Sequence, residues 1–144
     1  STQRHSYDVL GDSVSTAARI ESKCKEYGCV LLVGDATYQR TKEDFFWLKV
    51  DDLAVKGKSV GIGIWTVLDD VKPAWRVAQR KHQDMHTAYK NQKFDEAIKI
   101  CELLKTHFDG RMTAYYNMWI ERCEFMKTQP LPKDWNGVFI ATTK

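Results

Sequence analysis

The chain of 144 residues is 43% hydrophobic and 28% charged, which provides enough apolar side chains for one compact core or two small ones. Its net charge of +3 comes from basic and acidic residues spread along the whole chain, so a nucleic-acid-binding surface is not indicated. No apolar run approaches the roughly 20 residues that cross a bilayer, and no signal-peptide pattern opens the chain. We therefore expect a soluble, cytoplasmic protein with no membrane segment in this chain.

The first predicted element is a helix between two glycines, Gly11 and Gly28. Asp12 or Ser13 can cap its first turn, and a left-handed backbone at Gly28 would end it. Apolar and small side chains recur mostly three and four residues apart, which predicts that one side of the helix is buried. These side chains belong to Val14, Ala17, Ala18, Cys24 and Tyr27.

Three later segments have the composition of strands. Residues 29–33 (CVLLV) form an unbroken apolar run, which is typical of a strand covered on both faces. Residues 45–50 (FFWLKV) and 62–68 (IGIWTVL) are rich in aromatic and branched side chains. A short helix can begin at Gly34-Asp35 and run through Thr41. Together these segments predict a buried mixed sheet.

After Pro73 the pattern indicates helices alone, with apolar faces in segments 73–91, 94–110 and 112–126. Short connections make neighbouring helices antiparallel. Residues 88–98 (AYKNQKFDEAI) resemble the helix-turn-helix joint of a tetratricopeptide repeat, over little more than one repeat. An unrelated helical hairpin fits this pattern equally well, because a stable solenoid usually needs at least three repeats.

His82 and His86 lie four residues apart on the first of these helices, a spacing that could bind a metal ion. No third ligand is evident nearby. A solvated basic stripe that includes Arg80 and Lys81 is therefore the better interpretation.

Residues 7–22 (YDVLGDSVSTAARIES) place an acid, a hydroxyl and a guanidinium at one rim of the predicted sheet. Ser15 and Arg19 are four residues apart on the helix and share a face, and Asp8 lies upstream on a short strand. An arginine in this position could bind a phosphate through two hydrogen bonds. From chemistry alone, the same arginine could equally be a surface ion-pair partner of a nearby acid.

Residues 7–22 resemble the segment of class III adenylyl cyclases that runs from an adenine-selecting aspartate, through a glycine turn, to an asparagine and an arginine. Residues 55–67 (VKGKSVGIGIWTV) resemble the segment of the same family that supplies a lysine and a closing strand. The resemblance covers residues 5–68, roughly the C-terminal half of a cyclase catalytic domain. It implies an α+β fold with a partial ferredoxin-like cyclase sheet in residues 1–70. An all-helical, tetratricopeptide-like tail, similar to that of some bacterial cyclases, is then expected in residues 71–144.

The resemblance implies roles for four residues. Asp8 matches an aspartate that accepts a hydrogen bond from the exocyclic amine of adenine, and Lys56 matches a lysine that donates to a ring nitrogen. This pair favours adenine over guanine, which would leave both partners unpaired. Arg19 matches an arginine that meets the negative charge growing on the transferred phosphoryl group. Ser15 stands where the family usually has an asparagine, and its shorter hydroxyl predicts weaker alignment of the ribose.

Family members bind two magnesium ions through aspartates on earlier strands, and this chain is expected to hold no metal ligand. Mg²⁺ or Mn²⁺ is therefore expected in a parent enzyme, with ligands outside this chain, and the chain alone should not cyclise ATP. The family works as head-to-tail dimers, so a cyclase homodimer partner would supply the metal aspartates. An upstream region could anchor the parent to a membrane.

Two functions from different classes follow. In the first, the chain is a fragment of an adenylate cyclase, a lyase that converts ATP to cyclic AMP and pyrophosphate in signal transduction. In the second, it is a non-catalytic regulatory or protein-interaction module whose helical tail docks a protein partner.

Overall fold

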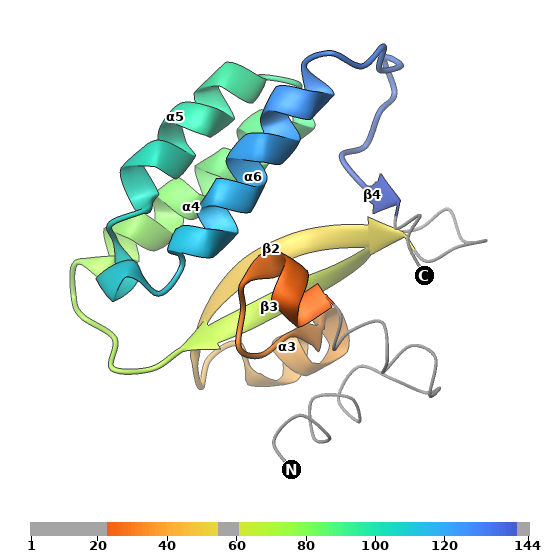
Figure 1. Ribbon diagram of the computed structural model, residues 1–144. Helices are drawn as coiled ribbons and strands as arrows, with labels where there is room; N and C mark the ends of the chain where they lie inside the picture. Colours follow the sequence, from red (N-terminus) through yellow and green to blue (C-terminus); the bar gives the residue numbers. More distant parts are fainter. Residues whose placement is uncertain (1–22, 55–60, 141–144) are drawn as a thin grey trace. The chain divides into compact units, whose positions relative to one another are not determined.

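The computed structural model describes residues 23–54 and 61–140, and it divides the chain into two compact units (Figure 1). The sheet unit combines the residues up to Asp70 with the segment that starts at Val138, and the helical unit is Val71–Gly137. Helices and strands are both present, so the α+β class is confirmed. The ferredoxin-like topology and the tetratricopeptide-like character of the helices stay predictions.

The described sheet has four strands in the spatial order β1-β3-β2-β4. Strand β3 runs antiparallel to both β1 and β2, whereas β4 runs parallel to β2. The two long strands, β2 and β3, therefore form the centre of this unit, as Figure 1 shows. The strands are β1 (Val33–Gly34), β2 (Phe46–Ala54), β3 (Ile62–Leu68) and β4 (Phe139–Ile140).

Most predicted elements of the sheet unit are confirmed, with one exception. Strand β3 has the predicted bounds, the short helix α3 (Asp35–Thr41) is present, and β2 continues four residues further than predicted. The predicted strand at 29–33 is wrong, because only its last residue belongs to a strand and Val30 is 95% exposed. Strand β4 is an element that the sequence did not predict.

The reason for the missing strand is the way in which the preceding helix ends. The Cys29 amide donates to the Cys24 carbonyl over 3.0 Å, so it serves the helix end instead of a strand ladder. Leu32 and Val33 are nevertheless buried, because the chain turns inward before β1. The apolar run thus supplies core side chains without forming the strand that its composition favours.

The helical unit contains three α-helices in its described residues: α4 (Trp75–Lys90), α5 (Phe94–Leu104) and α6 (Thr113–Met126). Helix α5 packs against both of the others. The second predicted helix is shorter than expected, because a separate 3-10 turn, η1 (Phe108–Gly110), follows it. The buried side chains recur at the predicted spacings. Among them are Ala78, Met85, Ala97, Cys101, Leu104, Tyr116, Trp119 and Cys123.

The segment after α6 returns to the junction of α4 and α5. The Trp135 ring packs edge-on against Tyr89 and Phe94, with centroid distances of 5.1 and 5.8 Å. The Gln92 side chain donates from Nε2 to the Pro132 carbonyl over 3.3 Å. These contacts fix the segment to the turn between the two helices. Across the described residues, helices that are long and apolar enough to span a membrane are absent.

Candidate functional site

The four residues predicted to form a nucleotide site, Asp8, Ser15, Arg19 and Lys56, all lie outside the described residues. The structure describes the segments that adjoin them in sequence. These are the helical residues 23–27, which follow Arg19, and strands β2 and β3, which precede and follow Lys56. The described geometry is therefore that of the segments that adjoin the predicted site residues in sequence.

The helical residues 23–27 end at Gly28, as predicted. Gly28 has a φ of +68°, and its amide donates to the Lys25 carbonyl over 3.2 Å. Together with the bond from the Cys29 amide to the Cys24 carbonyl, this is the Schellman arrangement, in which a left-handed residue lets two amides satisfy the last carbonyls. The helix end is thus fixed by its own backbone, immediately after Tyr27.

A buried hydrogen bond joins this helix end to β2. The Tyr27 hydroxyl donates to Asp51 Oδ2 over 2.5 Å, and the two residues are 0% and 2% exposed. The other carboxylate oxygen of Asp51 accepts from the Asp52 amide over 2.8 Å. A buried carboxylate needs such donors, because desolvation without them costs several kcal/mol. The bond therefore ties two segments that are 24 residues apart in sequence.

A register shift in β2 explains why Asp51 is buried. Lys49 pairs with Trp65 and Asp51 pairs with Ile64, so Val50 is an extra residue in β2. Side chains three residues apart lie on opposite faces of a regular strand. Here the Lys49 ammonium instead reaches Asp52 Oδ1 at 2.9 Å, since the bulge turns the strand between them. The sequence predicted that Tyr27 is buried, but it held no signal for Asp51.

Helix α3 is held to β3 by a polar and aromatic cluster. The Trp65 indole donates from Nε1 to Asp35 Oδ1 over 2.7 Å, and the Tyr38 ring stacks on Trp65 at 3.5 Å between centroids. Gly63 leaves room for the carboxylate, because a Cβ there would come within 2.7 Å of Asp35 Oδ1. The cluster is a packing contact of α3 that the sequence pattern did not predict.

All four cysteines are free, and three of them are buried. Burial raises the pKa of Cys29 from 9.0 to about 12, with a smaller contribution from neighbouring Cys24. Burial likewise raises the pKa of Cys123 to about 12 and the pKa of Cys101 still further. A thiol with a raised pKa is a poor nucleophile at neutral pH, since the thiolate is the reactive form. These three cysteines are therefore packing residues.

The histidine pair on α4 differs from the predicted solvated stripe. His82 is only 1% exposed, and its Nδ1 lies 2.7 Å from the Tyr116 hydroxyl. His86 Nε2 lies 3.3 Å from the Tyr115 hydroxyl. Both imidazoles thus bridge α4 to α6, because their positions on α4 face that helix. Within the residues that the structure describes, no three His, Cys, Asp or Glu side chains gather where they could hold a metal ion.

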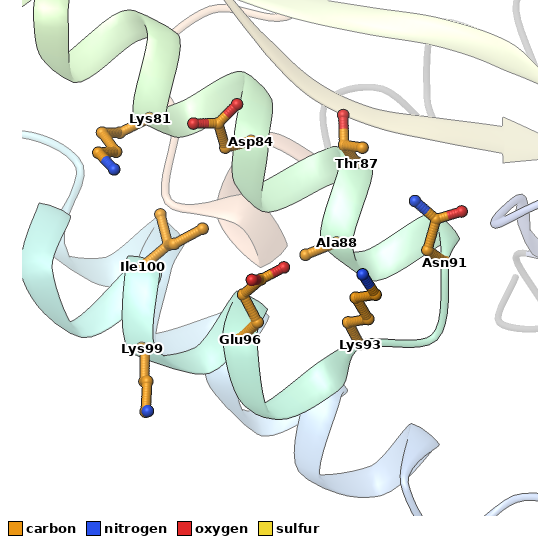
Figure 2. Close-up of a pocket in the computed structure, with 9 residues that line it drawn as sticks. All are labelled: Lys81, Asp84, Thr87, Ala88, Asn91, Lys93, Glu96, Lys99 and Ile100. Atoms are coloured by element: carbon orange, nitrogen blue, oxygen red, sulfur yellow. The ribbon is translucent and has the colours of Figure 1, made fainter.

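A groove of about 420 Å³ lies between α4 and α5, as the close-up in Figure 2 shows. Its lining combines apolar surface with polar and charged side chains of both signs. The charged residues are Lys81, Asp84, Lys93, Glu96 and Lys99. The groove is open to solvent along these exposed side chains, so it could accommodate a polar ligand without burying an unpaired charge.

Comparison with known proteins finds two relatives. A protein of Dictyostelium discoideum named "Adenylate cyclase, terminal-differentiation specific" is 35% identical over 102 residues, which cover 66% of this chain and 5% of the relative. An Anabaena cylindrica protein named "Adenylate cyclase" is 36% identical over 69 residues, which cover 46% of this chain and 14% of the relative. This chain is related to adenylate cyclases. No defined protein-family profile matches it, and no solved structure does either.

Proposed function

We propose that this chain is the nucleotide-recognition part of an adenylate cyclase, which converts ATP to cyclic AMP and pyrophosphate. The observation that carries this proposal is the 35% identity over 102 residues with the Dictyostelium relative. The chain spans only 5% and 14% of the two relatives, so the activity is proposed for the complete protein that contains it.

In the proposed reaction, the ribose 3′-hydroxyl loses its proton to water, its oxygen forms a bond to the α-phosphorus, and the bond from that phosphorus to the pyrophosphate breaks. Asp8 and Lys56 would read the adenine edge, and Ser15 would align the ribose. Arg19 would meet the negative charge that grows on the transferred phosphoryl group. These roles are supported by the two motifs that resemble class III cyclases, which occur in the family's order.

Cyclases of this kind use Mg²⁺ or Mn²⁺, which neutralises the triphosphate and activates the attacking hydroxyl. The proposal assigns the ion's ligands to residues outside this chain, supplied by a second cyclase subunit in a head-to-tail dimer, as the resemblance to class III cyclases implies.

The test is cyclic AMP formation from ATP by the complete purified protein, with Mg²⁺ or Mn²⁺ in the buffer. Arg19→Ala should lower kcat about a thousandfold or more, because an arginine at a transferring phosphoryl group contributes on that scale. Arg40→Ala is the matched control, since Arg40 is an exposed arginine in the last turn of α3 and should leave kcat unchanged. A wild type that forms no cyclic AMP, or equal activity in the two variants, would contradict the proposal.

Base selection is tested separately. Replacing both Asp8 and Lys56 by alanine should reduce the ratio of kcat/KM for ATP to kcat/KM for GTP at least tenfold, because the variant presents no hydrogen-bonding pair to either purine. An unchanged ratio would remove both residues from the base-reading role and would leave the role of Arg19 untouched.

A second candidate function is a regulatory or protein-interaction role for the helical unit, and the groove between α4 and α5 favours it. Replacing Lys81 and Lys93 by glutamate reverses two charges in the groove lining and should change the mass of the complete protein's assemblies, measured by light scattering. Lys25 and Lys133 are exposed and lie outside the groove, so the same change there should have no effect. Equal masses for the two variants would contradict this candidate.

A further inference from the structure

A buried side-chain hydrogen bond between Tyr27 and Asp51 connects helical residues 23–27 to β2 across 24 residues of sequence. Tyr27 is the last helical residue before the Gly28 turn, and Asp51 follows the bulge at Val50. Both backbones are thus fixed locally, one by the Schellman end and one by the ladder with β3. The bond therefore joins two rigid points.

A hydrogen bond restricts relative movement more than an apolar contact does. Its energy depends on distance and angle, whereas packed methyl groups can slide with little change in buried area. Removing the Tyr27 hydroxyl would also leave a buried carboxylate with one donor fewer, which is costly at 2% exposure. The pair consequently favours one relative position of the helix end and β2.

That relative position matters because each of the two tied segments adjoins, in sequence, a residue proposed for the nucleotide site. The helical residues 23–27 follow Arg19, proposed for the phosphoryl group, and β2 precedes Lys56, proposed for adenine. Both ends of one ATP molecule must be met at once, and a misplacement of about 1 Å can cost about a hundredfold in rate.

We propose that Tyr27 and Asp51 are positioning residues of the cyclase reaction, whose hydrogen bond holds helical residues 23–27 and β2, the segments that adjoin Arg19 and Lys56 in sequence, in one relative position. This inference rests on the proposed function. Neither residue contacts substrate in this proposal, and both act through the segments that they join.

The first test is the kinetics of Tyr27→Phe in the complete protein, because phenylalanine keeps the ring and removes only the hydroxyl. We expect kcat for cyclic AMP formation to fall at least tenfold and KM for ATP to rise at least threefold. A merely structural role would reduce the fraction of folded enzyme, which lowers apparent kcat and leaves KM unchanged. An unchanged KM would therefore overturn the inference.

A double-mutant cycle shows whether the two residues act through one bond. Asp51→Ala should raise KM at least as much as Tyr27→Phe, and the double variant should be no worse than Asp51→Ala alone. Asp51→Asn keeps the shape and can still hydrogen-bond both Tyr27 and the Asp52 amide. Its KM for ATP should therefore be much closer to that of wild type than the KM of Asp51→Ala. Effects that multiply in the double variant would contradict a shared bond.

Trp47→Phe is the matched control. Trp47 is a buried aromatic residue on β2, the strand of Asp51. Its indole donates to the Thr41 carbonyl over 3.2 Å, so this bond does not involve residues 23–27. Trp47→Phe removes this hydrogen bond, so it should destabilise the protein and leave KM for ATP within twofold of wild type. A KM shift equal to that of Tyr27→Phe would overturn the positioning role.

Hydrogen exchange provides a readout that does not depend on activity. Without nucleotide, peptides that cover residues 23–29 should exchange at least tenfold faster in Tyr27→Phe than in Trp47→Phe, and equal rates would overturn the inference. A wild type that forms no cyclic AMP would instead overturn the proposed function, and the exchange data would still report on the bond. The two failures are thus distinguishable.

Discussion

The helical unit and the sheet unit differ in the contacts that stabilise the interior of each. In the helical unit, buried side chains recur along α4, α5 and α6, and aromatic rings such as Trp119 fill the space between the helices. The sheet unit also has an apolar core, and there a buried polar bond, Tyr27 to Asp51, joins segments 24 residues apart in sequence. Periodic apolar faces predict the helices, whereas the polar contacts of both units, Tyr27 to Asp51 and His82 to Tyr116, are not encoded by periodicity.

Both units contain a helix that ends in a Schellman arrangement, but the left-handed residue differs between them. Helix 23–27 ends at Gly28 and α4 ends before Gln92, and each end has the same pair of backbone bonds with a left-handed residue between them. The Lys93 amide donates to the Ala88 carbonyl over 2.8 Å, and the Gln92 amide donates to Tyr89 over 3.0 Å. The helical unit thus uses a glutamine, with a φ of +61°, where the sheet unit uses glycine.

The largest effect is expected from the centre of the helical unit. Trp119 is 1% exposed and lies 4.6 Å from Tyr89 between ring centroids. Trp119→Ala should lower the free energy of unfolding by about 3 to 5 kcal/mol, since it leaves a large cavity. Urea unfolding followed by fluorescence and circular dichroism measures this loss. Phe125→Ala is the control, because Phe125 is 62% exposed and should change stability by less than about 0.5 kcal/mol.

A smaller loss is expected from the buried polar bond of the sheet unit. Tyr27→Phe should lower the free energy of unfolding by about 1 to 3 kcal/mol, because Asp51 loses a donor while the ring packing stays. The same urea experiment measures it. A loss as large as that of Trp119→Ala would break the contrast between the units, and a gain in stability would show that the hydroxyl is not needed to satisfy the carboxylate.

The buried thiols predict a fall in stability at high pH. Burial raises the pKa of Cys101 above its ordinary value of 9.0, so between these two pKa values the unfolded chain loses a proton that the folded chain keeps. Stability is therefore complete below pH 9 and decreases as the pH rises above it. From pH 8 to pH 10, the free energy of unfolding of Cys101→Ala should fall less than that of wild type, by about 1.4 kcal/mol. Parallel pH profiles for the two proteins would contradict the raised pKa.

The smallest effects are expected at the two helix ends. Gly28→Ala should destabilise the protein by about 1 kcal/mol, because alanine tolerates a φ of +68° poorly. Gln92→Gly should stabilise it by less than about 1 kcal/mol, since glycine relieves the same strain at the end of α4. Thermal unfolding of both variants checks these opposite signs. A destabilised Gln92→Gly would show that the bond from Gln92 to Pro132 outweighs the backbone strain.

In both units the sequence predicted the local elements better than the contacts between them. Helices α4 and α5 were predictable because each has one apolar face, although η1 shortened the second helix, and α6 was predictable because its large buried side chains recur three and four residues apart. The prediction that His82 lies on a solvated stripe was wrong. Its spacing along α4 does not show that the Tyr116 hydroxyl of α6 lies within hydrogen-bond distance of its ring. The nucleotide-site prediction for Asp8, Ser15, Arg19 and Lys56 stays a prediction, because these residues lie outside the described residues.

The sequence by itself determined the local features: the helical faces, the glycine that ends helix 23–27, the bounds of β3 and the relationship to adenylate cyclases. These depend on spacing, backbone stereochemistry and identity along a short stretch. Only the tertiary structure decided the bulge at Val50, the burial of Asp51 and the pairing of β4 with β2. The physical reason is that each of these depends on a partner far away in the chain, whose position the local pattern does not contain.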